Sequence, residues 1–366
     1  MTKLRDICRF QSGGTPSRGT PAYFNGNVPW ITTVALNGDV IDGNQAIEWI
    51  TDEAIAKSAA KIVPPHSVMV GTRVGIGKVA INSVPMSTSQ DIISLIGIDE
   101  NKWDKKFICH LITANKEHLT SQARGATIKG IKIEAIADLV LPEISLKEQA
   151  RISEVIGKVD ALMHMHQQMA MNLEQLIKSR FIELFGDYDL THPQESWVTI
   201  KEIGTVVGGA TPKTDHDEYW GGSYRWITPA ELDGDSGYIY DSVRKLTKAG
   251  VESCSLQEMP VGTVILSSRA PIGKVAIAGN TFYCNQGFKN IICKEGITPR
   301  YLYTVLLLNV EYLNSLGRGA TFKEISKGIV ESIRIPVPSM ELQQQFAAFV
   351  EQTDKSKLCG KMEVAA

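Results

Sequence analysis

Residues 146–185 read LKEQARISEVIGKVDALMHMHQQMAMNLEQLIKSRFIELF, and this stretch decides how the whole chain is organised. Large, mostly apolar side chains recur in it at alternating steps of three and four residues. This is the a/d pattern of a coiled-coil seam, sustained for about four heptads. The stretch contains no proline, and its one glycine, Gly157, costs on the order of 1 kcal/mol against alanine. The seam positions are Ile152, Val155, Val159, Leu162, His166, Met169, Leu173 and Leu176.

The ends of this stretch carry helix signals. Ser145 is a candidate N-cap, and Glu148 three residues later completes the spacing of a capping box. Gly186 supplies a stop at the other end. At about 1.5 Å per residue the helix would be roughly 60 Å long, too long for the interior of one small domain. It is therefore expected to act as a spacer between two globular parts.

Similar sequence lies on both sides of the spacer, in one nearly constant register. Three motifs repeat at an offset of 196 residues, and Arg-Gly-Ala-Thr at 124–127 returns at 318–321, an offset of 194. A repeat of nearly 200 residues is far too long for a solenoid unit and implies two complete domains. The three motif pairs are Gly-Gly-Thr-Pro at 13–16 with Gly-Ala-Thr-Pro at 209–212, Trp-Ile-Thr at 30–32 and 226–228, and Arg-x-x-Ile-Gly-Lys-Val-Ala-Ile at 73–81 and 269–277.

Helix-like and strand-like segments intermix in both copies, so each domain is expected to be α+β. The expected boundaries are 1–145 for the first domain, 146–187 for the spacer helix, 188–338 for the second domain and 339–366 for a C-terminal helix. Residues 104–119 and 299–316 are each expected to form one helix. Phe346 and Phe349 in the second copy correspond to Ile152 and Val155 in the first. The C-terminal helix is expected to stop near Lys357, so it looks cut short beside the spacer.

The composition describes an ordinary soluble globular protein, with 43% hydrophobic and 21% charged residues. The N-terminus has no apolar leader, and no stretch approaches eighteen uninterrupted apolar residues. The six cysteines form no CxxC pair, which favours free thiols in a reducing cytosol. A net charge of −2 is not typical of a basic nucleic-acid binder. If DNA is the partner, the basic residues must be concentrated on one face.

Basic side chains cluster at two kinds of place in each copy. One is a glycine-bearing turn with Arg73 and Lys78, repeated as Arg269 and Lys274; it is not a P-loop, because valine follows each lysine. The other is a basic loop before a strand, whose small residues and hydroxyls suit close approach to phosphate. Solvated turns and loops are the alternative interpretation. The loop candidates are Arg124, Thr127, Lys129 and Lys132, repeated as Arg318, Thr321, Lys323 and Lys327, with Lys213 and Arg225 as weaker candidates.

Catalytic and metal-binding patterns are absent from the sequence. We find no nucleophile elbow, no dinucleotide-binding glycine motif after a strand, and no adenine-methyltransferase motif. His164 and His166 lie two apart on a helix, point to different sides, and lack companion ligands. Together with the duplication, these observations favour a binding protein that needs no metal and no cofactor of its own.

The ordered motifs, their spacing, the Leu-Pro at 141–142 that returns as Ile-Pro at 335–336, and the long helix itself resemble the specificity subunits of type I restriction–modification systems. The resemblance covers nearly the whole chain. The second copy also has Asn-Gln-Gly-Phe at 285–288, typical of that family, whereas the first has Ser-Gln-Asp-Ile at 89–92.

The resemblance implies that each domain is a target-recognition domain reading one half of a split, asymmetric site in double-stranded DNA. It implies that the helices pair, set the spacing between the half-sites, and dock two methyltransferase subunits, with restriction or translocase subunits as further partners. S-adenosylmethionine and the chemistry would belong to those partners, in the cytoplasm. The seam residues, with Phe346 and Phe349, would be the helix-packing or partner-binding residues.

Three alternatives stay open on the sequence alone. The chain could be a truncated specificity subunit that self-associates through its exposed helix and does not support modification. It could be an enzyme with one domain modified for catalysis, or a duplicated binder of something other than DNA.

Overall fold

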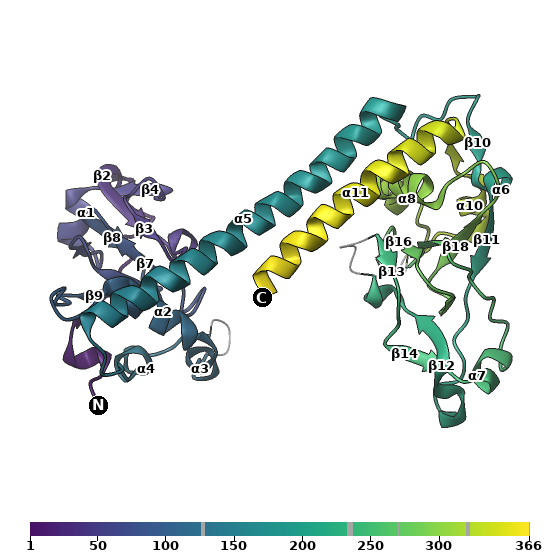
Figure 1. The fold of residues 1–366 in the computed structure, drawn as a ribbon. Coiled ribbons are helices and arrows are strands. Elements are labelled where there is room, and N and C mark those ends of the chain that lie inside the picture. The colour runs from purple at the N-terminus through teal and green to yellow at the C-terminus, as the bar shows by residue number, and fades with distance from the viewer. Residues whose placement is uncertain (126–128, 233–236, 270, 320–322, 366) are drawn as a thin grey trace. The chain divides into compact units, whose positions relative to one another are not determined.

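The computed structural model describes residues 1–125, 129–232, 237–269, 271–319 and 323–365, the last nine of these as helical backbone (Figure 1). The chain divides into two compact units, Met1–His164 and Met165–Ala366, with the boundary inside one long helix.

That helix, α5, spans Leu146–Phe185, as the sequence predicts. The capping box is present, because the N–H of Glu148 donates to Ser145 Oγ at 3.2 Å and the N–H of Ser145 donates to Glu148 Oε2 at 3.2 Å. Gly186 has a φ of 90°, and its N–H donates to the carbonyl of Ile182. A non-glycine residue would be strained in that left-handed conformation, so glycine ends the helix there.

The first unit contains a five-stranded sheet, in the order β1-β9-β6-β7-β3, and a four-stranded sheet, in the order β4-β2-β8-β5. Most neighbours are antiparallel, but β2 pairs with β8 and β3 with β7 in parallel. The strands are β1 (Arg9–Ser12), β2 (Phe24–Ile31), β3 (Val40–Ile41), β4 (Glu48–Ile50), β5 (Ile62–Val63), β6 (Val68–Gly71), β7 (Val79–Asn82), β8 (Met86–Thr88) and β9 (Ile92–Ile96). The helices are α1 (Asp52–Lys57), α2 (Lys105–Ala114), α3 (Lys116–Ser121) and α4 (Ile133–Ala137), with 3-10 turns at Leu4–Asp6, Pro21–Tyr23 and Thr33–Ala35.

The five-stranded sheet of this unit is covered on both faces. Val68 and Val70 point to one face, where they join Ile108 and Ile112 of α2 in one buried cluster. Met69, between them, points to the other face and packs with Ile31 and other residues of the second sheet. Successive side chains of a strand alternate between faces, so a central strand covered on both sides must be apolar throughout. This accounts for the uninterrupted apolar runs at β6 and β7.

The second unit repeats this architecture, with a five-stranded sheet β11-β18-β15-β16-β13, a three-stranded sheet β14-β12-β17 and a short pair β10-β19. Its strands are β10 (Val198–Thr199), β11 (Gly204–Gly208), β12 (Trp220–Ile227), β13 (Tyr238–Ile239), β14 (Arg244–Leu246), β15 (Val264–Leu266), β16 (Val275–Ala278), β17 (Tyr283–Cys284), β18 (Lys289–Cys293) and β19 (Arg334–Ile335). Its helices are α6 (Ile200–Ile203), α7 (Lys248–Glu252), α8 (Pro299–Leu308), α9 (Val310–Ser315), α10 (Lys327–Ser332) and α11 (Met340–Ala365), with 3-10 turns at Asp217–Tyr219 and Pro229–Glu231.

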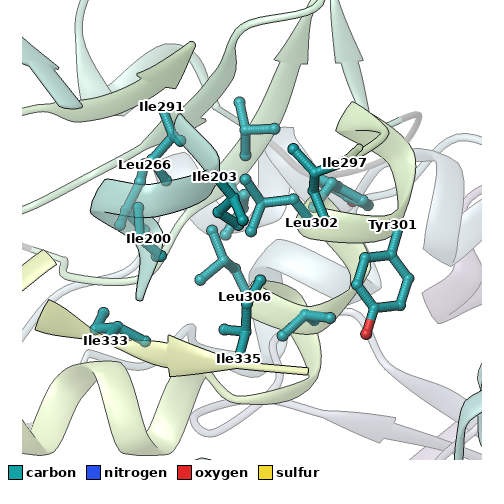
Figure 2. Close-up of a cluster of buried hydrophobic side chains, with 14 of the residues drawn as sticks. Ile200, Ile203, Leu266, Ile291, Ile297, Tyr301, Leu302, Leu306, Ile333 and Ile335 are labelled. Atoms are coloured by element: carbon teal, nitrogen blue, oxygen red, sulfur yellow. The ribbon is translucent and has the colours of Figure 1, made fainter. Parts of the chain in front are cut away.

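The core of the second unit lies between its five-stranded sheet and the helices. Figure 2 shows side chains of α6, β15, β18, α8 and β19 converging there, with Leu302 and Leu306 of α8 facing Ile203. The same cluster includes Phe181 and Phe185 from the end of α5. The last turns of α5 are therefore part of the second unit's core.

The C-terminal helix packs against this end of α5. Phe346 is fully buried, with its ring centroid 5.4 Å from that of Phe181 and 5.6 Å from that of Phe185. The guanidinium of Arg180 lies 5.8 Å from the ring centroid of Phe349. The prediction that the helix stops near Lys357 is wrong, because α11 runs to Ala365 over 26 residues, against 40 for α5. Loss of the heptad pattern does not end a helix when good helix formers such as leucine, lysine and methionine continue it.

Most of the predicted seam on α5 is open to solvent within this chain. Six of its apolar side chains are 38–54% exposed, and Leu173 is half-buried. The exposed six are Ile152, Val155, Val159, Leu162, Met169 and Leu176. Their role in packing against a partner stays a prediction.

The repeated glycine and tryptophan motifs are parts of one structural contact. The indole N–H of Trp30 donates to the carbonyl of Gly14 at 3.1 Å, and that of Trp226 donates to the carbonyl of Ala210 at 3.1 Å. A Cβ on Gly13 would lie 2.1 Å from the Ser89 carbonyl oxygen, closer than any real contact. These motifs are therefore repeated because both units need the same close packing.

The two expected helices 104–119 and 299–316 are each broken in the middle. The break falls at Asn115 between α2 and α3, and at Asn309 between α8 and α9. Each asparagine donates through Nδ2 to a carbonyl four residues earlier, at 2.8 Å for Asn115 and 2.9 Å for Asn309. A side chain that bonds the preceding turn competes with the helical hydrogen bonds, which explains both breaks.

Two equivalent glutamines attach the long helices to their units. Gln149, 1% exposed, accepts from the N–H of Asp104 and donates to the carbonyls of Lys102 and Ile144, at 3.0–3.2 Å. Gln343, fully buried, makes the same three kinds of bond in the second unit, at 2.8–3.0 Å. Each carboxamide thus satisfies three backbone groups at the root of its helix.

We expect Gln149→Leu and Gln343→Leu each to lower the free energy of unfolding of one unit by about 2–3 kcal/mol, because buried backbone groups lose their partners. Calorimetry should resolve the effect as a lower Tm for the first unit with Gln149→Leu and for the second with Gln343→Leu. Gln168→Leu on the exposed surface of α5 is the control. Equal effects of all three substitutions would contradict the assignment.

Candidate nucleic-acid interface

In the first unit, the basic turn and the basic loop lie against each other. The N–H of Ile131 donates to the carbonyl of Thr72 at 2.8 Å, and Arg124 and Gly130 exchange backbone hydrogen bonds of 2.9 and 3.0 Å. A Cβ on Gly130 would lie 2.8 Å from Cγ of Arg73, so the glycine allows the arginine to cross the base of the loop. Arg73 and Arg124, fifty-one residues apart, are thereby placed together.

The second unit repeats this arrangement. The N–H of Ile325 donates to the carbonyl of Ser268 at 3.1 Å, and Arg318 and Glu324 exchange backbone hydrogen bonds of 3.0 and 2.9 Å. Arg269 bridges to Glu324 through its backbone, so turn and loop again form one basic surface. We call the described residues of turn and loop together the basic face: 72–78 with 124–125 and 129–132 in one unit, and 268–269 and 271–274 with 318–319 and 323–327 in the other.

Seven of the predicted basic residues expose their side chains and, within the described ranges, form no ion pair with a carboxylate. They are available for an anionic partner such as a phosphate. These seven are Lys78, Arg124, Lys129, Lys132, Lys213, Arg318 and Lys323.

The other predicted basic residues have partners within the chain. Arg225 pairs with Asp241 at 3.1 Å, and Lys327 pairs with Glu331 at 3.7 Å. Lys274 is half-buried, and its ammonium donates to the carbonyl of Pro229 at 3.1 Å, so it holds a backbone segment in place. Arg73 and Arg269 each face a carboxylate, as described below. Thr127 and Thr321 lie outside the described residues.

Sequence reasoning missed two lysines beside the basic faces. Lys289 lies in β18 with its side chain 14% exposed, where the first copy has Ile93. Lys116 begins α3, and a Cβ on Gly77 of the basic turn would lie 3.2 Å from its Cγ. The signal for Lys289 was present as a lone charge in an apolar strand, visible once the two copies are aligned.

One carboxylate in the second basic face is strongly paired. Glu324 contacts Arg269 at 2.8 Å and Lys289 at 3.2 Å. The hydrogen bond from Arg269, together with that from Lys289 and the charges of both, holds the pKa of Glu324 below its ordinary value. The carboxylate is therefore ionised near neutral pH and neutralises part of the positive charge around it.

Three further features of the described residues concern reactive thiols, metal ligands and membrane-spanning helices. Burial raises the pKa of the Cys8, Cys109, Cys284 and Cys293 thiols to about 12, so these thiols stay protonated and unreactive. Among the described residues, no three histidine, cysteine, aspartate or glutamate side chains group as metal ligands. No described helix combines the length and apolarity that crossing a membrane requires.

The sequence of this chain matches one known protein family twice. The family described as the type I restriction modification DNA specificity domain matches residues 1–175 and again 195–360. The type I restriction enzyme MjaIX specificity subunit of Methanocaldococcus jannaschii is 42% identical over 185 residues, which are 49% of this chain and 43% of that protein. The type I restriction enzyme EcoR124I/EcoR124II specificity subunit of Escherichia coli is 30% identical over 222 residues, which are 58% of this chain and 53% of that protein. The matches thus span about half the length of each of these relatives.

Two solved structures resemble the whole chain. The type I restriction–modification system S subunit from M. genitalium has a TM-score of 0.61 at 16% identity, covering 100% of this chain and 91% of that one. A chain from a structure described as the structural basis of complex assembly and conformational transition of the type I restriction–modification system has a TM-score of 0.54 at 17% identity, covering 100% of this chain and 92% of that one. At such identities the likeness concerns the fold, and it confirms the prediction of two mixed α/β domains joined by a long helix.

Proposed function

This chain belongs to the type I restriction modification DNA specificity family, and we propose that it is the subunit that selects the DNA sequence for such a system. Each unit reads one half of a split, asymmetric site in double-stranded DNA. The partners are methyltransferase subunits, two of them by the symmetry of the duplication, and, where present, restriction or translocase subunits.

The observation that carries this proposal is the repetition of the basic face. Both units join a basic turn to a basic loop through the same backbone hydrogen bonds, and both leave several cations unpaired within the described ranges. Contacts from such cations to phosphate provide affinity and position the protein, whereas contacts to base edges provide sequence specificity. Since the two faces differ in sequence, they would read different bases.

Helix α5 links the two readers in this proposal. A rigid link makes the second binding event intramolecular, which raises the overall affinity without any new contact. The exposed seam side chains, from Ile152 to Leu176, offer apolar surface for a methyltransferase subunit or a partner helix.

The chain itself would be non-catalytic, since the chemistry would reside in the methyltransferase with its S-adenosylmethionine. The alternative, a chain that only self-associates through α5, is not favoured. Both family matches extend into the helices, over 1–175 and 195–360, and the start of α11 is already packed against α5.

Co-expression with the type I modification subunit of the same genome, in a host without adenine methylation, should produce methylated adenine in one split, asymmetric motif. Sequencing by a modification-sensitive method would reveal it. Replacing residues 1–145 with the first domain of another specificity subunit should change only one half of that motif.

Three results would contradict the proposal. Methylation of a single, unsplit motif would argue against two readers, and a domain exchange that altered both halves would argue against their independence. If a methyltransferase complex that lacks this chain methylated the same motif, the chain would not be the subunit that selects the DNA sequence.

A further inference from the structure

In each unit a carboxylate lies against the turn arginine of the basic face. In the first unit, Nη1 of Arg73 lies 3.5 Å from Oδ1 of Asp91, with the side chains 48% and 29% exposed. In the second, Nη2 of Arg269 lies 2.8 Å from Oε2 of Glu324, with the side chains 46% and 32% exposed. The two arginines are equivalent in the duplication, at an offset of 196.

The two acids, by contrast, come from positions that are not equivalent. Asp91 lies between β8 and β9, and its counterpart in the second unit is Gly287. Glu324 lies at the base of the basic loop, and its counterpart in the first unit is Gly130. Each unit thus has glycine where the other has its acid. The pairing of arginine with carboxylate persists although the residue that provides it has changed.

The surroundings of the acids have changed together with them. The second unit has Lys289 where the first has Ile93, and Nζ of this lysine lies 3.2 Å from Oε1 of Glu324. Among the described residues, Glu324 thus forms ion pairs with two cations, whereas Asp91 forms an ion pair with one, at a longer distance. The second unit therefore holds its carboxylate more firmly than the first.

A stability role explains this repetition poorly. Ion pairs between partly exposed side chains contribute about 0–1 kcal/mol, which gives little reason to rebuild the pair from a different position. A role in DNA binding explains the repeated ion pair better. A carboxylate at a surface where an anion would bind repels phosphate and competes with it for the same arginine.

We propose that Asp91 and Glu324 are specificity-determining residues that hold the turn arginines away from DNA until a matching sequence displaces them. This inference rests on the proposed function. Binding to any DNA then requires the free energy of separating arginine from carboxylate. Only a site that makes the full set of contacts offsets this free energy. Such a repulsive element raises discrimination by weakening binding to incorrect sequences more than to the correct one.

Removing the negative charge should therefore strengthen binding to non-specific DNA. With Glu324→Gln we expect affinity for a duplex lacking the target motif to rise about tenfold near 0.15 M salt. The salt dependence should become steeper by about one charge, because a freed arginine adds about one phosphate contact. Affinity for the target duplex should rise less, so the ratio of the two falls. Asp91→Asn should act in the same direction with a smaller effect, since its ion pair is longer.

The measurement is titration of the full chain with target and non-target duplexes at several salt concentrations, the target being the motif found by methylation mapping. Glu351→Gln is the matched control, because it removes the same charge from an exposed pair with Lys355 on α11. Circular dichroism and the Tm of each unit establish that the variants are folded.

The outcomes separate this inference from the function on which it rests. If wild-type chain binds the target preferentially but Glu324→Gln and Asp91→Asn leave non-target binding equal to that of Glu351→Gln, the inference is overturned and the function stands. If the wild-type chain shows no salt-dependent binding to any duplex, the proposed function itself is overturned.

Discussion

Replacing Phe181 with alanine is expected to lower the free energy of unfolding of the second unit by about 3–5 kcal/mol, as large-to-small changes of a buried phenylalanine do. Phe181 is 2% exposed and lies at the end of α5. Its ring centroid is 5.7 Å from that of Tyr301 on α8 and 5.4 Å from that of Phe346 on α11. Alanine would leave a cavity where three helices meet, and rigid neighbours from separate elements can fill it only partly.

Calorimetry of the full chain should therefore show the Tm of the second unit falling by roughly 6–20 °C, at 2–4 °C per kcal/mol for a unit of this size. The Tm of the first unit should stay unchanged. Leu162→Ala is the matched control, because Leu162 lies on the same helix but is 48% exposed. A loss of similar size with Leu162→Ala would mean that the seam of α5 is packed in the isolated protein, contrary to the structure.

The long helix and the duplication could be predicted from sequence because their signals are local or repeated. A sustained apolar period, a capping box at Ser145 and a stop at Gly186 fix the bounds of α5 without any tertiary information. Two copies in one register each support the assignment of the other. The unbroken apolar run Val68, Met69 and Val70 is also a local signal, since only a sheet covered on both faces needs apolar side chains on both sides of a strand.

The breaks at Asn115 and Asn309 were missed because the apolar period continues across them. What interrupts the helix is a side-chain hydrogen bond to the preceding turn, and hydrophobic spacing carries no information about it. The short strands β5 and β8 cannot be recognised from sequence for a related reason. Two or three residues provide too little alternation to recognise, and pairing with a distant strand defines them.

The sequence predicted the candidate site as separate loops. It could not predict that these loops lie against each other. The contact between the turn at Arg73 and the loop at Arg124 depends on long-range backbone hydrogen bonds such as Ile131 to Thr72. Which of the basic residues are occupied is equally a tertiary property. Lys274 has the same sequence context as Lys78, yet in the part of the chain that the structure describes it is Lys274, not Lys78, that donates to a distant carbonyl, that of Pro229.

Reversing two charges in the first basic loop, with Arg124→Glu and Lys129→Glu together, is expected to weaken DNA binding on the order of 100-fold near physiological salt. Both side chains are exposed and, in the described ranges, unpaired with acids. The change removes two cations and adds two anions that repel phosphate. The slope of log affinity against log salt should become shallower by about two, one for each lost phosphate contact.

The control reverses two charges elsewhere, with Lys158→Glu and Lys355→Glu on the long helices, where the lysines pair with Glu154 and Glu351. Equal loss of binding in both double variants would mean that net charge matters and the loop does not.

The methylated motif adds a second criterion for the role of the loop. Phosphate contacts carry no sequence information, so a loop that only binds phosphate should weaken methylation at every site and leave the motif unaltered. A motif relaxed at one position in one half would instead place Arg124 or Lys129 on a base edge, where a good bidentate contact contributes about 1–3 kcal/mol of discrimination.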